Sequence, residues 1–376
     1  MIFYLTVNEA PSGIFSSQVI DVVKFLNTNF DTKARLLAFI SLRGYFVNRA
    51  KIKQELPNAI VLPMYPKMQN WEKNKFLFGI ICWAYKTKMI IARSVIASKL
   101  ALVIRDKNKA IKVIYDGRGA IEAEWREYKV VTDTSLLTVI SAYEREVILN
   151  SDFRIAVSSA LVNFWKSDYS YKDTKHVVIP CTLNAAFEKI NITGNAILEK
   201  RKELKVDVND TVFVYSGSVA GWQSFNLLVS FIEPILKKSN SNKMVFFSPA
   251  DPNLDQLKKL FPGQVICKHL KPEHVTNYLI VGDYGLLIRE NSITNKVASP
   301  VKYAEYLASG LKVILSDGLG DYSQLSVEKN WGFIFKGSND IIIKPTLSEK
   351  QKISSEAIQF FSKQNYKEQY KQLISA

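Results

Sequence analysis

The stretch from residue 283 to residue 317 combines the residue types and spacing of an anion-binding site. An apolar run that ends at Ile288 predicts a buried strand, and the polar residues after it predict a loop. Ser299 then offers an N-cap and Pro300 the first helical position of a helix that continues over residues 301–309. The start of such a helix presents unpaired N–H groups and a positive dipole end at the carboxyl edge of a parallel sheet, where anions bind.

Three charged side chains accompany this predicted helix. Lys302 in its first turn would add a cation to the anion site, and Glu305 lies one turn further along the same face. Arg289, at the end of the preceding strand, is a second candidate cation. The alternative is an ordinary helix of a doubly wound domain in which Glu305 is merely solvated.

Polar residues also follow two predicted strands in the first half of the chain. Arg93 ends one strand, and Asp116 and Arg118 follow the next, with Glu122 and Glu124 shortly after. Neighbouring parallel strands deliver such residues to one edge of the sheet, which is where site residues gather. The structural alternative is an Asp–Arg pair that pins a turn.

Two glycine-containing turns could approach a ligand closely. Gly13 follows the first predicted strand, and Gly217 and Ser218 end the first predicted strand of the second half, before a helix. A Gly-Ser turn before a helix can cradle phosphate through its backbone N–H groups. The turn at Gly13 is equally compatible with a plain tight turn.

The run SPVKYAEYLASGLKVI, residues 299–314, resembles the donor-binding helix of retaining GT-B glycosyltransferases, in particular those of family 4. The resemblance implies that Glu305 holds the ribose of a nucleotide sugar. It implies that the helix start, with Ser299, Val301 and Lys302, holds the phosphates of the donor.

Other segments gain an expected role from the same resemblance. His269 and Leu270 would lie in the loop that cups the base through backbone groups, and Gly217 and Ser218 would lie beside the donor diphosphate. The glycine loop at Gly13 would face the cleft between the domains. The turn at Asp116 and Arg118 resembles an acceptor-side loop, which makes these two residues catalytic candidates. Arg93, Glu122 and Glu124 are then candidates for the acceptor side.

The sequence also departs from the family pattern. Family members usually carry two Glu residues eight positions apart, and the first would fall on Val297, so its role passes to Glu290 or is absent. Trp222 and Gln223 stand where a basic residue is common, which makes Arg289 the candidate for the missing cation.

No Asp-x-Asp motif supports a metal ion, so we expect no metal and no cofactor, with the nucleotide sugar as co-substrate. The charge of the leaving diphosphate would then fall on Arg289, Lys302 and the helix start.

Composition limits the class of protein. A chain of 376 residues with 47% hydrophobic and 23% charged residues predicts two domains of a globular protein. Cys82, Cys181 and Cys267 lie far apart, which suits a reducing compartment and argues against a structural zinc site. The first residues do not resemble a signal peptide, and the longest apolar stretch, residues 76–85, is too short to span a bilayer. We therefore expect a cytoplasmic protein that touches a membrane at most from one side.

The basic charge is concentrated in residues 67–112, which hold eleven Lys and Arg against two acidic residues in a chain of net charge +15. Aromatic residues, including Trp71, Phe76, Phe78 and Trp83, lie among these lysines. One interpretation is a core helix with a solvated rim. The other is a surface that docks on anionic lipid. Nucleic acid is not the expected partner, because the aromatic residues form apolar runs instead of alternating over a sheet face.

Strands alternate with helices in both halves, which predicts an α/β protein with two doubly wound, Rossmann-like domains. With the resemblance, the expected fold is GT-B, in which the two domains face each other across a cleft. The boundaries are an acceptor-side domain over residues 1–183, a donor domain over residues 184–347, and a terminal helix over residues 348–376 that crosses back to the first domain.

The expected function is a retaining, metal-independent glycosyltransferase of the hexosyltransferase type. It would move a sugar from a nucleotide-diphosphate donor to a cell-surface glycan or lipid-linked precursor. A first rival is a GT-B epimerase that hydrolyses the nucleotide sugar, with Asp116, Glu122 and Glu124 as acid/base groups. A second rival is a noncatalytic subunit, which Val297 in place of the first Glu makes conceivable.

Overall fold

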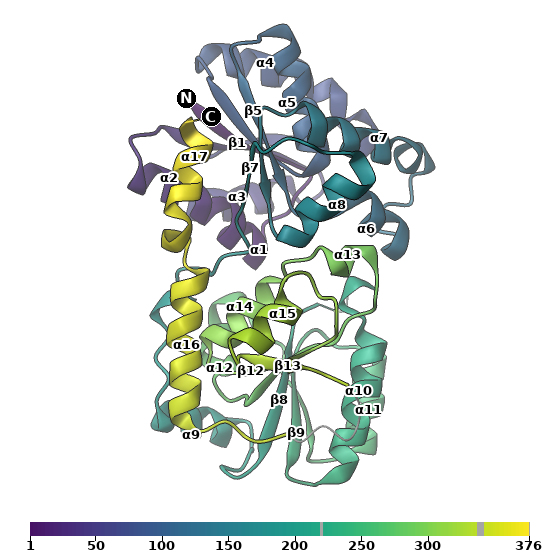
Figure 1. Cartoon of the computed structure of the whole chain (residues 1–376), viewed down its shortest axis with the longest axis vertical. Coiled ribbons are helices and arrows are strands. Elements are labelled where there is room, and N and C mark those ends of the chain that lie inside the picture. The colour runs from purple at the N-terminus through teal and green to yellow at the C-terminus, as the bar shows by residue number, and fades with distance from the viewer. Residues whose placement is uncertain (219–220, 337–341, 376) are drawn as a thin grey trace. The chain divides into compact units, whose positions relative to one another are not determined.

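The computed structural model describes residues 1–218, 221–336 and 342–375 (Figure 1). The chain divides into two compact units. Unit 1 comprises Met1–Asn184 and the residues from Lys363 onward, and unit 2 comprises Ala185–Ser362. Among the described residues, no helix is both long and apolar enough to cross a membrane.

Unit 1 is built on a parallel sheet of seven strands in the order β3-β2-β1-β4-β5-β6-β7. The strands are β1 (Ile2–Val7), β2 (Ala34–Ile40), β3 (Ile60–Pro63), β4 (Met89–Arg93), β5 (Lys112–Gly117), β6 (Phe153–Ala156) and β7 (His176–Val178). The strands β1, β2, β4 and β5 are short, largely apolar runs that are buried almost throughout, as parallel strands covered by helices must be. The carboxyl ends of β1, β4 and β5 therefore lie side by side at one edge of the sheet.

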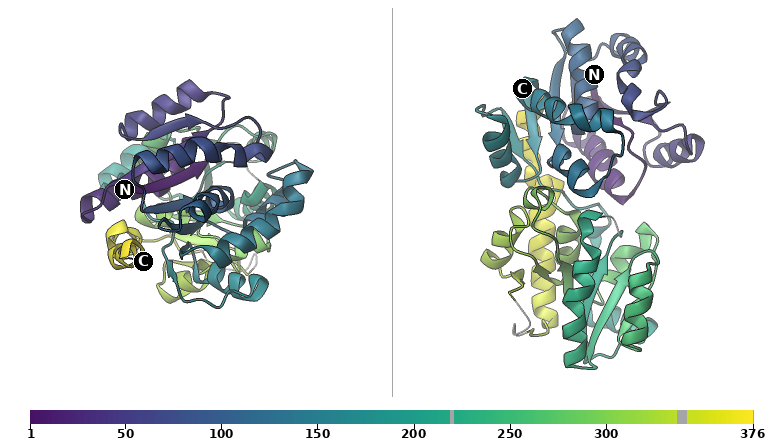
Figure 2. Two further views of the ribbon diagram at one scale, coloured as in Figure 1. Left: turned by 90° about the horizontal axis from the view of Figure 1, so that it is seen from above. Right: turned by 90° about the vertical axis from the view of Figure 1, so that its right-hand side faces the viewer.

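Helices cover both faces of this sheet (Figure 2). They are α1 (Gly13–Phe15), α2 (Asp21–Asn29), α3 (Tyr45–Glu55), α4 (Lys75–Ala84), α5 (Ser94–Lys107), α6 (Ile121–Tyr128), α7 (Thr134–Asn150), α8 (Ser159–Tyr169) and α17 (Lys367–Ser375), with a π-helical turn η1 (Ser16–Ile20) and 3₁₀ turns η2 (Met68–Asn74) and η6 (Lys363–Tyr366). Tyr370 and Leu373 of α17 are buried in the same core as Ile2 and Tyr4 of β1. The last helix is thus an integral part of unit 1.

Unit 2 is built on a parallel sheet of six strands in the order β10-β9-β8-β11-β12-β13. The strands are β8 (Thr211–Ser216), β9 (Asn242–Phe247), β10 (Val265–Cys267), β11 (Tyr284–Leu287), β12 (Lys312–Leu315) and β13 (Gly332–Ile334). The helices are α9 (Gly194–Glu203), α10 (Phe225–Lys238), α11 (Pro252–Leu260), α12 (Val275–Leu279), α13 (Ile293–Lys296), α14 (Val301–Ala308), α15 (Tyr322–Glu328) and α16 (Leu347–Phe361), with 3₁₀ turns η3 (Phe187–Lys189), η4 (Gly221–Gln223) and η5 (Pro272–His274).

Helix α14 packs closely on the second sheet because Gly285 of β11 has no side chain. A Cβ atom at Gly285 would lie 2.3 Å from the ring of Tyr306 in α14. The Tyr306 hydroxyl in turn accepts a hydrogen bond of 2.8 Å from the backbone N–H of Ser216, at the end of β8. This contact fixes α14 against the carboxyl end of β8.

The structure corrects the predicted start of this helix. Pro300 has a ψ of 121° and is the N-cap, so α14 begins at Val301 and not at Pro300. Ser299 does not cap the helix, and its hydroxyl lies 2.7 Å from the hydroxyl of Tyr322 instead. The loop predicted after β11 contains the short helix α13.

The segment predicted as one terminal helix forms two. Helix α16 belongs to unit 2 and α17 to unit 1, separated by Ser362 and η6. A capping box at Thr346 and Glu349 starts α16. The Ser354 hydroxyl donates a hydrogen bond of 2.5 Å to the carbonyl of Ala308, so α16 supports α14.

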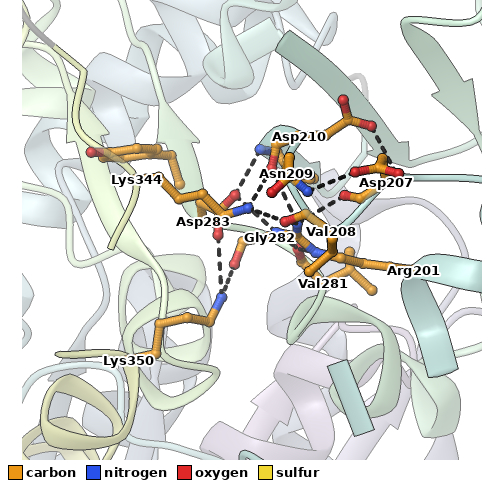
Figure 3. A network of polar contacts seen from close by, with 12 residues as sticks. Arg201, Asp207, Val208, Asn209, Asp210, Val281, Gly282, Asp283, Lys344 and Lys350 are labelled. Atoms are coloured by element: carbon orange, nitrogen blue, oxygen red, sulfur yellow. Dashed lines mark hydrogen bonds and ion pairs between the residues drawn. The ribbon is translucent and has the colours of Figure 1, made fainter. Parts of the chain in front are cut away.

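A buried polar network holds α16 on the amino edge of the second sheet (Figure 3). Arg201 Nη2 lies 2.9 Å from Asp283 Oδ2, and Lys350 Nζ lies 3.8 Å from Asp283 Oδ1. Lys350 also donates to the carbonyls of Gly282 and, at 3.3 Å, of Ile280. Burial is the main reason that the pKa of Lys350 falls to about 8 from its usual 10.5, and Asp283 opposes this shift.

This lowered pKa predicts a pH-dependent contribution to stability. Between pH 8 and 10.5 the unfolded chain binds the Lys350 proton more tightly than the folded chain, so the free energy of unfolding should rise with pH over that window. Relative to Lys350→Met, the wild-type protein should gain on the order of 2 kcal/mol between pH 7.5 and 10. Urea unfolding followed by circular dichroism at several pH values measures the difference.

Lys352→Met is the matched control, because this lysine lies two residues further along α16 and is exposed. The difference between wild type and the control should stay constant with pH. A constant difference for Lys350→Met as well would show that burial does not suppress the charge of Lys350.

Candidate functional site

The carboxyl edge of the second sheet gathers most of the predicted donor-binding residues. Strands β8, β11 and β12 are neighbours in the order β8-β11-β12. Gly217 and Ser218 follow β8, Arg289 and Glu290 follow β11, and α14 leads into β12. His269 and Leu270 follow β10 at the same carboxyl edge, with β9 and β8 between β10 and β11.

The first turn of α14 holds an ion pair. Lys302 Nζ lies 2.8 Å from Glu305 Oε2, and both side chains are partly buried. The second carboxylate oxygen of Glu305 has no hydrogen bond within the described part of the chain. Lys302 and Glu305 therefore present a cation and an open acceptor close to the start of α14.

Arg289 is buried at the end of β11 and is held by its neighbours. Its backbone N–H donates to Ser316 Oγ at 2.8 Å, and its Nη1 donates to Asn295 Oδ1 at 3.4 Å. Asn295 also donates to the carbonyl of Glu290 at 3.1 Å. The buried Asn295 thus orders the turn that carries Arg289, a role that no local pattern in the sequence indicates.

Residue 297, where the family pattern expects a Glu, and Glu290, the candidate to replace it, differ in environment. Val297 is buried in the apolar interior, whereas the Glu290 side chain is exposed. The backbone N–H of Glu290 donates to Ser224 Oγ at 2.9 Å, which fixes its main chain. A carboxylate is therefore present at the end of β11 and absent at residue 297.

The turn after β8 is held by two tyrosines. The Tyr215 hydroxyl donates to the carbonyl of Ser218, and Tyr306 accepts from the N–H of Ser216. A Cβ atom at Gly217 would lie 3.1 Å from the Tyr215 hydroxyl, so a larger residue would fit only with adjustment. Residues 216–218 are therefore fixed by contacts within unit 2.

In unit 1, Arg93 and Asp116 pair directly across β4 and β5, as their positions at strand ends predict. Asp116 is buried. Its Oδ2 accepts a hydrogen bond from Tyr4 and lies 3.7 Å from Arg93 Nη1, and its Oδ1 accepts from Arg118 at 3.3 Å. The alternative interpretation of these residues was an Asp–Arg pair that pins a turn. That pair is present, because Asp116 and Arg118 contact each other across the turn.

The two arginines of this cluster have further partners in unit 1. Arg93 Nε donates to Glu9 at 2.9 Å. Arg118 Nη2 donates to Gln18 Oε1 at 3.1 Å and to Cys181 Sγ at 3.1 Å. Burial opposes the charge of Arg93, but Glu9, Tyr4 and Asp116 together hold its pKa above the usual value, so it stays charged.

The predicted acceptor-side carboxylates Glu122 and Glu124 lie on α6, whose first N–H groups are capped by a residue that sequence reasoning missed. The buried Glu144 of α7 accepts hydrogen bonds of 2.9 Å from the backbone N–H groups of Ile121 and Glu122. Burial raises the pKa of Glu144 to about 7. Glu122 pairs with Arg126, and burial raises the pKa of Glu124 to about 7. Glu124 is therefore the α6 carboxylate whose proton exchanges near neutral pH.

Gly13 is exposed and is the first residue of α1. A Cβ atom there would meet no atom within 4 Å, so the turn leaves space beside its backbone. Ser12 provides the helix cap, because its hydroxyl accepts from the N–H of Phe15 at 3.2 Å.

No family model and no curated protein matches this chain. Several solved structures have a similar fold. A glycosyltransferase from Rickettsia africae has a TM-score of 0.74 at 14% identity, covering 99% of this chain and 97% of its own. The Anabaena protein HepE, solved with UDP, has a TM-score of 0.73 at 14% identity over 100% of this chain and 99% of its own. Sucrose-phosphate synthase from Thermosynechococcus elongatus reaches 0.70 at 13% identity over 100% and 98%.

At these identities the likeness concerns the fold. It spans the full length of the chain and both parallel sheets, of seven and six strands. The chain has the α/β fold of the GT-B glycosyltransferases.

Proposed function

We propose that this chain is a retaining, metal-independent glycosyltransferase that uses a nucleotide-diphosphate sugar. The observation that supports it most is the carboxyl edge of the second sheet, where Arg289, Lys302 and Glu305 gather around the start of α14. A site that binds a nucleoside diphosphate needs positive charge for the phosphates and a carboxylate for the vicinal ribose hydroxyls. HepE, which has the same fold, was solved with UDP.

In the proposed reaction, the leaving diphosphate gains charge as the bond to the sugar breaks. Arg289, Lys302 and the N–H groups at the start of α14 would stabilise that charge without a metal ion. Glu305 would hold the ribose through its open oxygen. Glu290, exposed at the end of β11, is the carboxylate proposed to contact the transferred sugar in place of residue 297.

On the acceptor side, we assign Asp116 a positioning role toward Arg118. Its two oxygens are occupied by Tyr4 and Arg118, so Asp116 would act by orienting the guanidinium. Glu124 is the better candidate for proton exchange with an acceptor hydroxyl, because its raised pKa of about 7 suits a general base or acid near neutral pH. The proposed acceptor is a cell-surface glycan or lipid-linked precursor, met in the cytoplasm at the inner face of the membrane.

A screen of nucleotides by thermal shift tests this proposal. UDP, GDP, ADP, CDP and dTDP, each at millimolar concentration, would be compared with their sugar conjugates. One base should raise the melting temperature by several degrees, because a ligand that binds only the folded state stabilises it. No shift with any nucleotide would contradict the proposal.

A noncatalytic subunit with the same fold is the second candidate, favoured by the buried Val297. An activity assay with the nucleotide that raises the melting temperature distinguishes the two candidates. Incubation of its sugar conjugates with the protein and a glycan or lipid-linked acceptor extract should release the free nucleoside diphosphate if the chain is an enzyme. Binding without any release, with or without acceptor, would favour the noncatalytic candidate.

A further inference from the structure

Helix α4 presents an apolar stripe on its outer face. Phe76, Ile80 and Trp83 are 68%, 63% and 82% exposed, and their spacing of four and three residues places them on one side of the helix. Phe78 and Cys82, on the opposite side, are buried. Large apolar side chains this exposed and this regularly spaced mark an interaction surface.

The structure separates the aromatic residues of segment 67–112 into two groups. Trp71 and Phe78 belong to the interior, where Trp71 contacts Tyr143 and Phe78 contacts Phe39 edge-on. Phe76 and Trp83 belong to the surface. The sequence pattern treats these four residues alike, and burial identifies the pair that can meet a partner.

Lysines lie directly beyond the end of this helix. Lys86 and Lys88 follow α4 in the turn that leads into β4, and Lys33 precedes the parallel strand β2 at the same amino edge of the sheet. All three are exposed, and none forms an ion pair with a carboxylate among the residues described. In the same turn, Tyr85 is exposed and packs under the guanidinium of Arg35.

A hollow of about 580 Å³ opens at this amino edge of the first sheet. Lys33, Lys88 and Lys112 line it together with the apolar side chains of Met89 and Ile374. Among the described lining residues Asp31 is the acidic one, and Asp152 lies 3.9 Å from Lys112. The amino edge is therefore positively charged, and it lies opposite the carboxyl edge that holds Arg93 and Asp116.

We propose that unit 1 docks on an anionic lipid bilayer through this surface, here called the docking face: Phe76, Ile80, Trp83, Lys33, Lys86, Lys88 and Lys112. Exposed aromatic and aliphatic side chains enter the acyl boundary, and lysines beside them bind anionic headgroups. The excess of lysines over acidic groups matches a negatively charged surface. This inference is independent of the proposed reaction, because the docking face belongs to unit 1 and the proposed donor-binding residues belong to unit 2.

Sedimentation with vesicles tests the docking face. Vesicles of phosphatidylcholine with 0, 20 or 40% phosphatidylglycerol would be used at 50 and 300 mM salt. Binding should rise with anionic lipid and fall with salt. Neutralising Lys33, Lys86 and Lys88 together should weaken binding to the anionic vesicles about 100-fold, since each lysine near such a surface is worth about fivefold.

The apolar stripe has its own variant, Ile80→Ser with Trp83→Ser. It should weaken binding at both salt concentrations, because burial in the acyl boundary is not screened.

Matched controls carry the same changes elsewhere. The control for the lysine variant neutralises three exposed lysines of unit 2, Lys238, Lys258 and Lys259. The control for the apolar variant changes the exposed Leu260 and Val327 to serine. These controls should bind vesicles like the wild type. All variants should keep the melting temperature shift with nucleotide, so a failure of docking and a failure of the proposed function remain separate.

Two results would overturn the inference. One is equal binding to neutral and anionic vesicles at 50 mM salt. The other is a loss of binding in the control variants as large as in the docking-face variants, which would indicate attraction by net charge alone.

Discussion

Replacing Glu305 with alanine should weaken binding of the cognate nucleoside diphosphate about 30- to 700-fold. Two charge-assisted hydrogen bonds to vicinal ribose hydroxyls contribute about 2–4 kcal/mol, which sets this range. Glu305 is placed for this role one turn inside α14, with one oxygen on Lys302 and the other open. Isothermal titration with the nucleotide found in the thermal-shift screen measures the loss, and Glu305→Gln should give a smaller one.

The stability of the variant must be checked in parallel, because Glu305→Ala also releases Lys302 from its ion pair. The pair is partly exposed, so its loss should change the midpoint of urea unfolding only slightly. Glu273→Ala, at an exposed position of unit 2, is the control and should bind nucleotide normally. Normal affinity in folded Glu305→Ala would remove Glu305 from the site.

Replacing Arg289 with alanine should lower kcat about 100- to 1000-fold while turnover by the wild type persists in excess EDTA. This is the effect of removing one preorganised donor from a site that develops negative charge. Arg289 is buried and oriented by Asn295, so its charge needs little reorganisation as the diphosphate leaves. Steady-state assays with and without EDTA measure both parts of the prediction.

Arg289→Lys keeps the charge and loses the forked geometry, so we expect an intermediate kcat. Arg145→Ala, exposed on α7 of unit 1, should leave kcat unchanged. Activity that EDTA abolishes and magnesium restores would show that a metal ion, and not Arg289, carries the charge of the diphosphate.

Strands such as β1, β2 and β4 were predictable because each is a short apolar run that the sheet buries on both faces. The pairing of Arg93 with Asp116 was predictable for the same reason, since both end strands of one parallel sheet. Helix α6 was not predicted. Its first N–H groups are capped by Glu144, which lies more than twenty residues further along the chain, so the N-cap signal is absent from its own start, although Glu122 and Glu124 in the first turn favour a helix there.

The environment of the predicted site residues could not be predicted from the sequence either. Asp116 is paired by Tyr4, and Arg118 by Gln18 and Cys181, which come from distant parts of the chain. The start of α14 was misplaced by one residue because Pro300 suits both the N-cap and the first helical position, and only its ψ decides. The sequence identifies which residues are charged. Tertiary packing decides which of those charged side chains are already paired within the protein and which can bind a ligand.

The division of α16 and α17 between the two units has a consequence for synthesis on the ribosome. The core of unit 1 includes Tyr366, Tyr370 and Leu373, so it is incomplete while only residues 1–184 have emerged. Unit 2 is a single continuous segment, residues 185–362, and is available in full before those core residues are made. The unit that is translated first is therefore the unit whose core closes last, and the nascent chain must hold an unfinished apolar surface on α2 until α17 arrives.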